Sequence, residues 1–312
     1  MSAVFIVVPV FALIAAGYAA VALRFISPTA HKGISEFAFS IAIPALLFRI
    51  VVVAEFPAVN AFAVWAAYYG ATATWIVALL ASSVLRQSRA DGVVLAIGSI
   101  YGNIVMLGLP LTLSALGSQA AGSMALILSV NTPLLWLCGT LQMAWAERKS
   151  SESAPLLVLR AVREIARNPI MLALGFGFLW RLTGLGLHPV ADKTLELLAQ
   201  AGSPTALIAL GINLFGFKIR GQALGMAVMC ALKLLAMPAI AAILAFYVLA
   251  LPPISAAVVV LFAAMPTGAN AYIFSAQYGR LTEAVSGAVA LGTVLAAVTL
   301  PVIVAFVTVG LR

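Results

Sequence analysis

The sequence predicts an all-α, polytopic membrane protein, and three observations support this fold class. Of the 312 residues, 64% are hydrophobic and only 8% are charged, whereas a soluble globular domain carries about 25% charged residues. Mostly apolar runs, each long enough to cross the hydrocarbon core of a bilayer, recur along the whole chain. The sequence shows no series of short segments with alternating polarity, which a transmembrane β-barrel would need.

These apolar runs predict ten membrane spans. Their approximate ranges are 3–23, 34–53, 61–84, 91–116, 119–146, 169–187, 195–217, 222–249, 254–278 and 283–309. Twelve of the 17 Lys and Arg residues fall in one set of alternating loops, and four fall in the other set. Because short loops rich in Lys and Arg stay in the cytoplasm, we expect both termini on the opposite side of the membrane.

The longest polar break, residues 147–169, divides the ten spans five and five. We therefore predict a first five-helix repeat at 1–146, a cytoplasmic linker at 147–168 and a second five-helix repeat at 169–312. Apolar residues at helical spacing within the linker predict an amphipathic helix that lies on the lipid surface. Because five is odd, repeats related by duplication must insert with opposite orientation, which is a plan found in secondary transporters.

Two spans place helix-breaking residues near their middle. The stretch GNIVMLGLP (Gly102–Pro110) lies in the fourth span, and MPTGAN (Met265–Asn270) lies in the ninth, its counterpart in the second half. Pro removes a backbone donor and Gly permits unusual dihedrals, so together they can unwind a turn. The second and seventh spans likewise share IPALLF and SPTALI, where we predict helix breaks or hinges at Pro44 and Pro204. These pairs predict broken fourth and ninth helices that cross at the membrane centre.

Such breaks would create an anion site. Peptide groups freed inside hydrocarbon must face protein, water or a ligand. The N-termini of half-helices carry partial positive charge and free N–H groups, which suit a carboxylate. The structural alternative for each residue is a proline kink or an Asn that joins two helices. The candidate substrate-binding residues in and beside the breaks are Asn103, Gly108, Pro110, Pro266, Thr267, Gly268, Asn270 and Tyr272.

Lys233, in the stretch ALKLLAMP, is the ionisable residue deepest in a predicted span, and we include it among the substrate-binding candidates. Intramembrane charges are expensive and are functional candidates by default. The side chain could neutralise a bound anion, pair with a backbone carbonyl, or extend to the membrane interface. No Asp or Glu lies deep in a predicted span, which argues against a coupling site built on a buried carboxylate. The choice between H⁺ and Na⁺ as a coupling ion stays open.

Composition and motifs exclude other classes of function. No H-E-x-x-H motif is present, and the histidines, His31 and His188, fall in loops predicted on opposite sides. The cysteines, Cys138 and Cys230, sit in apolar spans and form no metal-ligand cluster. We therefore expect no enzyme activity, no metal and no cofactor. The formal charge of +8 does not indicate nucleic acid, because the basic residues are scattered through short loops.

Five stretches support a resemblance to a known family. They are FSIAIPALLF (Phe39–Phe48), YGNIVMLGLP (Tyr101–Pro110), RNPIMLALGFG (Arg167–Gly177), GSPTALIALG (Gly202–Gly211) and AMPTGANAYIFSAQYG (Ala264–Gly279). As a set, and in this order, they resemble the auxin efflux carrier family, which includes the PIN-like transporters of plants and many bacterial proteins. The last stretch is most similar to the bacterial branch that includes malonate transporters.

This resemblance implies a fold shared with bile acid/sodium symporter-like proteins: ten helices in two inverted five-helix repeats. It implies that the broken fourth and ninth helices cross near the substrate. It also implies that spans one, two and five of each repeat form the two halves of a mobile and static arrangement, and that substrate moves by an elevator-like shift.

We accordingly expect an elevator-type secondary active transporter of small organic anions, either a malonate-like dicarboxylate or an auxin-like carboxylate. The expected partners are a small carboxylate substrate and the lipid bilayer, with a homodimer left open and nucleic acid excluded. The alternative function is an anion channel or a ligand-sensing membrane receptor on the same fold. A channel would need a continuous polar face along several helices, whereas the polar residues here cluster at mid-span.

Overall fold

The computed structural model describes residues 3–27, 30–53, 60–147, 167–217 and 223–309. Within these residues the chain is helical, as expected for a polytopic α-helical membrane protein. Seven helical segments are long and apolar enough to cross a membrane: Ala3–Ala22, Lys32–Val53, Ala61–Val84, Ile104–Glu147, Pro189–Gly216, Ala223–Val248 and Thr282–Val309. The count of ten spans therefore stays a prediction. The predicted amphipathic linker helix lies outside the described residues.

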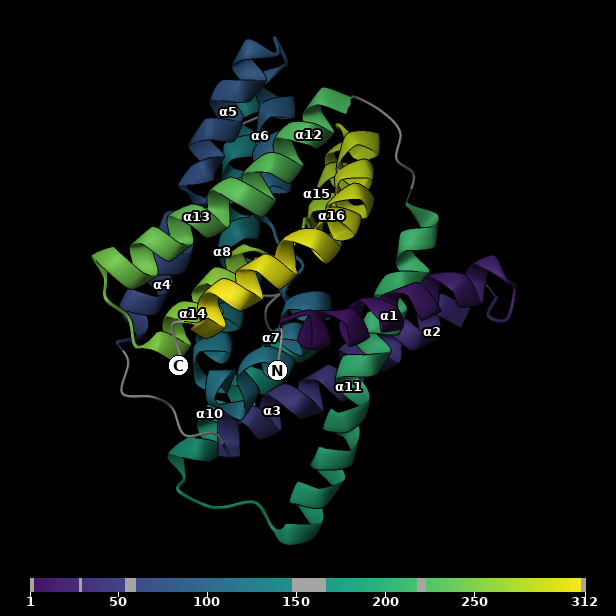
Figure 1. Ribbon diagram of the computed structural model, residues 1–312, viewed down its shortest axis with the longest axis vertical. Helices are drawn as coiled ribbons and strands as arrows, with labels where there is room; N and C mark the ends of the chain where they lie inside the picture. Colours follow the sequence, from purple (N-terminus) through teal and green to yellow (C-terminus); the bar gives the residue numbers. More distant parts are fainter. Residues whose placement is uncertain (1–2, 28–29, 54–59, 148–166, 218–222, 310–312) are drawn as a thin grey trace.

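The helices form two bundles, and the first is the smaller. Its elements are α1 (Ala3–Ala22), α2 (Ala30–Phe37), the π-helical segment η1 (Ala38–Ala42), α3 (Ile43–Val53), α10 (Pro169–Leu182) and α11 (Pro189–Gly216). Helix α11 packs against both α1 and α3, and α10 packs against α3. Figure 1 shows α3, α10 and α11 together in the lower half of the view. Helices distant in sequence thus form one body.

The second bundle contains the remaining helices. Its first-half elements are α4 (Ala61–Gly70), η2 (Ala71–Ala73), α5 (Thr74–Val84), α6 (Arg89–Ile100), η3 (Ile104–Gly108), α7 (Leu109–Leu116), η4 (Gly117–Ala120) and α8 (Ala121–Glu147). Its second-half elements are α12 (Ala223–Ala231), η5 (Leu232–Ala236), α13 (Met237–Ala242), η6 (Ile243–Val248), α14 (Pro253–Ala263), α15 (Ala269–Tyr278) and α16 (Thr282–Val309). Figure 1 shows α5, α6 and α12 at its upper end.

The packing of α8 corrects one expectation. The family resemblance implied that the fifth span groups with the first two spans of its repeat. Instead, α8 packs mainly against α6 and α4 and makes smaller contacts with α3 and α10 of the first bundle. The reason lies in its contacts with the second bundle, where the Ser123 hydroxyl is hydrogen-bonded to that of Ser255 in α14 and Trp65 of α4 donates to the carbonyl of Leu126. This helix therefore belongs with the broken helices.

Close backbone packing holds the first bundle together. A Cβ atom at Gly17 of α1 would lie 2.2 Å from the carbonyl oxygen of Ile208 in α11, and one at Gly211 would lie 1.9 Å from that of Ile14. Only glycine permits this approach, which resembles small-residue packing in membranes generally. At one end of the bundle, Arg49 Nε and Nη2 donate to the Asp192 carboxylate at 2.7 and 3.2 Å. This bidentate pair joins α3 to α11.

Three prolines of the chain each follow a π-helical segment by two residues. Pro44 follows η1, Pro110 follows η3 and Pro238 follows η5. Pro cannot donate to the carbonyl four residues earlier and clashes with it, and the wider turn, with N–H groups bonding five residues back, removes that clash. Helix α11, by contrast, runs through Pro204 without interruption. The hinge roles predicted for Pro44 and Pro204 stay predictions.

Candidate functional site

The two predicted breaks meet in the second bundle. Residues 101–103 separate α6 from η3, and residues 264–268 separate α14 from α15. The backbone N–H of Asn103 donates to the carbonyl of Pro266, and that of Gly268 donates to the carbonyl of Tyr101, both at 2.8 Å. Gly102 and Thr267 form a short antiparallel bridge between these bonds. Each break thus supplies hydrogen-bond partners to the other, which meets the requirement for non-helical backbone at membrane depth.

The helices that lead into the crossing are enclosed by protein. In α14, all residues from Ser255 to Ala263 are buried, and α6 is nearly as enclosed. A helix that is apolar on every side is typical of a core position. The Thr267 hydroxyl also donates to the carbonyl of Gly98 in α6 at 2.8 Å. The crossing is therefore held by packing as well as by hydrogen bonds.

Glycine is required at the crossing because the two backbones approach closely. A Cβ atom at Gly268 would lie 3.1 Å from the Cα and N atoms of Asn103. A Cβ atom at Gly102 would lie 2.9 Å from Cε of Lys233. The first of these contacts is with backbone, which cannot rotate away, and the second is with a flexible side chain. Gly268 is consequently the stricter requirement.

A cavity of about 360 Å³ lies beside the crossing, between the two bundles. The crossing and α8 supply one wall, and η1, the start of α10 and α11 supply the other. Its polar lining residues are Ser35, Ser40, Tyr101, Asn103, Asn131, Thr132, Asn168, Asn213 and Asn270. Among the described residues that line it, none is Lys, Arg, His, Asp or Glu. The lining is thus polar but uncharged, with five amide side chains.

Three helix N-termini end at this cavity. Asn103 caps η3 through Oδ1, which accepts from the N–H of Met106 at 3.3 Å. Asn168 caps α10 by accepting from the N–H groups of Ile170 and Met171. Helix α15 begins after Gly268 with no side-chain cap. Because first-turn N–H groups have no intrahelical partner, α15 presents free donors and partial positive charge to the cavity.

Two buried amides at the cavity have atoms without a partner among the described residues. Asn103 is 6% exposed, and its Nδ2 has no acceptor. Its Oδ1 is engaged in the cap, so the donor orientation of Nδ2 is fixed by the hydrogen-bond network. Asn131 of α8 is 1% exposed, and its Oδ1 has no donor. Both atoms are themselves enclosed by protein, so neither faces the cavity in this conformation.

Tyr101 organises the amide on the second broken helix. Its hydroxyl accepts a hydrogen bond from Asn270 Nδ2 at 3.1 Å and also forms a hydrogen bond with Thr132 of α8. The hydroxyl thereby connects the first break, α8 and α15 at one point. This contact holds the Asn270 side chain at the cavity wall.

Lys233 does not line the cavity. It lies in η5, is fully buried, and its ammonium donates to the carbonyl of Ala263 and to Met237 Sδ, the latter at 3.3 Å. Ala263 is the last residue of α14, where the helix dipole places partial negative charge. The sequence left three roles open for this lysine, and these contacts correspond to the one in which it pairs with a backbone carbonyl.

The other predicted residues divide into three groups. Gly268 and Asn270 line the cavity directly, as Asn103 does. Pro266 and Thr267 form the crossing, and Gly108 and Pro110 lie behind it on the η3–α7 helix. Tyr272 points elsewhere and stacks edge-on against Phe217, with ring centroids 5.1 Å apart. Substrate contact by these residues stays a prediction.

Several cavity residues were not among the sequence candidates. Asn131 and Thr132 come from α8, Asn168 from the start of α10, and Asn213 from α11. Each carries an amide or hydroxyl in or beside an apolar span, and Asn131 precedes Pro133 much as Asn168 precedes Pro169. A search for every amide inside the predicted spans would have found Asn131 and Asn213, although it would not have shown that they meet.

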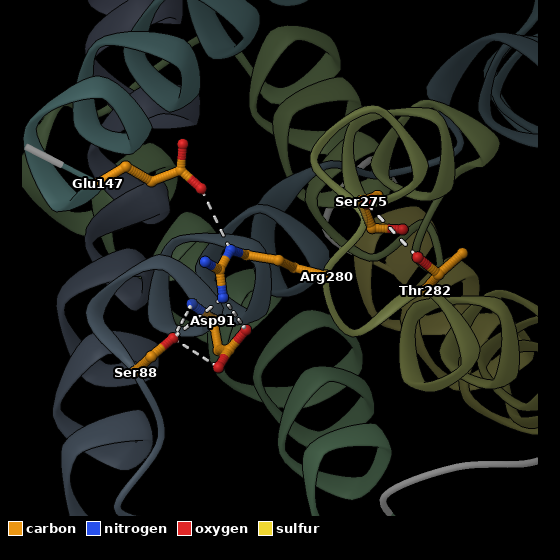
Figure 2. A network of polar contacts seen from close by, with 6 residues as sticks. All are labelled: Ser88, Asp91, Glu147, Ser275, Arg280 and Thr282. Atoms are coloured by element: carbon orange, nitrogen blue, oxygen red, sulfur yellow. Dashed lines mark hydrogen bonds and ion pairs between the residues drawn. The ribbon is translucent and has the colours of Figure 1, made fainter. Parts of the chain in front are cut away.

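A charged network holds the far end of the broken helices. Figure 2 shows Arg280, between α15 and α16, reaching toward Asp91 and Glu147. Its Nη1 donates to Asp91 Oδ1 and its Nε to Glu147 Oε1, both at 3.3 Å. Desolvation lowers the pKa of Arg280, but the hydrogen bonds with both carboxylates outweigh it and the net pKa is raised. The network ties α15 to α6 and α8 as one body.

Comparisons with known proteins agree with this architecture. Residues 2–304 match a family described as "Membrane transport protein". A protein of Rhizobium meliloti (strain 1021) described as "Putative malonate transporter" is 25% identical over 296 residues, which cover 94% of this chain and 92% of that protein.

Proposed function

The chain belongs to the family of membrane transport proteins, and from that premise we propose that it moves a small organic anion by secondary active transport. The substrate is a malonate-like dicarboxylate or an auxin-like carboxylate. The name of the Rhizobium meliloti relative supports the former. The protein lies in the bacterial inner membrane with both termini periplasmic, and its ten spans form two inverted repeats, 1–146 and 169–312.

One observation supports this proposal more than any other. A polar cavity, with no charged side chain among the described residues that line it, receives the N-termini of η3, α10 and α15, of which only α15 lacks a side-chain cap. Three converging N-termini favour an anion, each with roughly half an elementary charge. A cation would meet the same positive potential with no carboxylate to offset it.

The position of the cavity supports an elevator-like movement. One wall belongs to the bundle of α1, α3, α10 and α11, and the other belongs to the crossing. A substrate held on the crossing would travel with the second bundle when the bundles slide past each other. The ion pair Arg49–Asp192 and the Arg280 network each join helices of one bundle, which suits two rigid bodies.

The lining residues also suggest which side is open. Ser35, Asn168 and Asn213 adjoin the loops before α2, before α10 and after α11. The positive-inside rule assigns these loops to the cytoplasm. We therefore propose that this conformation faces inward, with the cavity accessible from the cytoplasm.

Thermal stabilisation of the purified protein by mono- and dicarboxylates tests the proposal. A ligand at 100 times its Kd stabilises the folded state by about 2.7 kcal/mol. We expect stabilisation by a small carboxylate in the wild type, and its loss in Asn270→Ala at an unchanged unliganded Tm. Stabilisation by amines or neutral solutes, but by no carboxylate, would contradict the proposal. Saturable uptake and counterflow in proteoliposomes would distinguish a transporter from a channel or receptor.

A further inference from the structure

We propose that Asn213 of α11 binds a second polar group of the substrate. The cavity would then select a malonate-like molecule with two polar ends over a carboxylate whose other end is apolar. This inference rests on the proposed function and narrows the substrate class named there.

The amide of Asn213 is available to a ligand. This residue is only partly buried, and it lines the cavity between the two bundles. Among the described residues, none forms a hydrogen bond with its side chain. The unpaired atoms of Asn103 and Asn131, by contrast, are enclosed by protein. The Asn213 amide therefore differs from these two because a ligand in the cavity can reach it.

The first bundle supplies few other polar groups to the cavity. Those of the described residues are Ser35, Ser40, Asn168 and Asn213. The Ser35 hydroxyl oxygen is enclosed, and Asn168 Oδ1 accepts from the first N–H groups of α10. Ser40 contributes only a hydroxyl. Asn213 is thus the amide on this wall whose donor and acceptor are both free within the described part of the chain.

Asn213 faces the crossing from the opposite wall. It lies in the last turn of α11, and α11 packs against η3, the segment that follows the first break. The proposed function places one carboxylate at the start of α15, on the wall formed by the crossing. The cavity, at about 360 Å³, has the size of a site for a small ligand. A substrate with polar groups at both ends would therefore contact both bundles.

The chemistry of an amide explains the selection. An Asn side chain offers two donors and one acceptor oxygen, so it can donate to a carboxylate or accept from an amide or a protonated carboxyl group. An apolar group in the same place would remove water from the Asn213 amide without replacing its hydrogen bonds, which costs free energy. A site that hydrogen-bonds a substrate group rejects an analogue that lacks that group.

Two ligands of the same shape and charge test this inference. Malonamate and isovalerate are both monoanions at neutral pH and have the same arrangement of non-hydrogen atoms, but the second end of isovalerate is apolar. We expect the wild type to bind malonamate at least about tenfold more tightly than isovalerate. In Asn213→Leu we expect this preference to fall below about threefold.

Gln200→Leu is the matched control, because it removes an amide from the same helix. Gln200 is exposed and donates to Glu196 at 3.1 Å. We expect this variant to keep the wild-type preference for malonamate over isovalerate. Loss of the preference in both variants would show that any change on α11 has this effect, and would overturn the assignment to Asn213.

Asn213→Asp tests the same contact by a gain. Its carboxylate can still accept a hydrogen bond from the amide of malonamate, but it repels the second carboxylate of malonate. We expect the ratio of malonamate affinity to malonate affinity to rise at least about tenfold above the wild-type ratio. A folding defect weakens both ligands together and so cannot produce this rise. An unchanged ratio would overturn the inference.

The outcomes for the wild type separate the two proposals. Equal binding of malonamate and isovalerate would overturn the role of Asn213 and leave carboxylate transport standing. Failure of malonate, malonamate, isovalerate and longer carboxylates to bind would overturn the proposed function itself. Titration of each ligand into the purified full-length protein measures these affinities.

Discussion

The two helix breaks differ in how completely they satisfy their own backbone. After the first break, Asn103 caps the following helix, and η3 then relieves the clash of Pro110. After the second break, α15 starts at Ala269, directly after Gly268, with no side-chain cap and no π-helical turn. The breaks look equivalent in sequence, since both combine Pro, Gly and Asn, but only the second leaves backbone donors at the cavity without a side-chain cap.

This difference indicates that the two breaks have different roles. The first break is largely self-contained, so its main effect is to fix the position of the second through the bonds at Asn103 and Gly268. The second break leaves its N-terminal donors for a ligand. Mutations at the first break should therefore affect stability and binding together, while mutations at α15 should affect binding alone. The predictions below follow from this contrast, from the largest expected effect to the smallest.

Replacement of Gly268 should have the largest effect. In Gly268→Val, the new side chain would press on the Asn103 backbone, 3.1 Å from the Cβ position, and the two breaks could not keep their hydrogen bonds. We expect carboxylate binding to fall by more than about 100-fold and stability to fall by about 1–3 kcal/mol. Gly175→Ala in α10, where a Cβ meets nothing within 4 Å, is the matched control. Ligand titration and thermal unfolding measure both effects.

Removal of the Lys233 ammonium should affect stability more than binding. In Lys233→Met, the carbonyl of Ala263 loses its buried donor, which costs about 1–3 kcal/mol. Because Lys233 does not line the cavity, we expect carboxylate affinity to change less than about threefold. A loss of affinity above tenfold at unchanged stability would instead support the role in which this lysine neutralises the bound anion.

Replacement by Ala should have different effects on stability at Asn103 and at Asn270. Asn103→Ala removes a helix cap, which costs about 1 kcal/mol of stability, and also removes the free Nδ2 donor. Asn270→Ala removes a side chain that bonds only to the Tyr101 hydroxyl, so stability should change by less than about 0.5 kcal/mol. We expect both variants to bind carboxylate at least about tenfold more weakly. Equal destabilisation by the two variants would contradict the different roles assigned to the two breaks.

Removal of the Tyr101 hydroxyl should have the smallest overall effect of these substitutions. Tyr101→Phe keeps the ring in its buried place but frees the amide of Asn270 to rotate. We expect a three- to tenfold loss of carboxylate affinity, consistent with about one neutral hydrogen bond. Thr308→Val, which removes a hydroxyl bonded to the carbonyl of Val304 within α16, serves as the control. Affinity loss of similar size in both would show that the Tyr101 contact has no special role.

The sequence was sufficient to predict the breaks but not all of the cavity. Pro, Gly and Asn within apolar spans act locally, so Gly102–Pro110 and Met265–Asn270 could be identified without a structure. The partner of the Lys233 side chain could not be identified from the sequence, because it is the carbonyl that α14 places opposite η5. The roles of Asn131 and Asn213 depend on the packing of α8 and α11 around the crossing, which no local pattern determines.

The broken spans also show what hydropathy alone does not predict. Helix α6 has 12 residues, with Ser88 as its N-cap and Asp91 in its first turn, and α14 has only 11 residues, so neither is a long apolar helix by itself. Each is half of a broken helix whose ends are satisfied by the other break. Hydropathy joins the two halves into one run, whereas the folded chain separates them by an unwound turn.

A structure of the protein with bromomalonate bound would test the central claim most directly, because the bromine locates the ligand without ambiguity. The account predicts one carboxylate at the start of α15, within hydrogen-bond distance of the backbone N–H groups of Ala269 and Asn270. A ligand bound at Lys233, or at the capped start of α10, would contradict it.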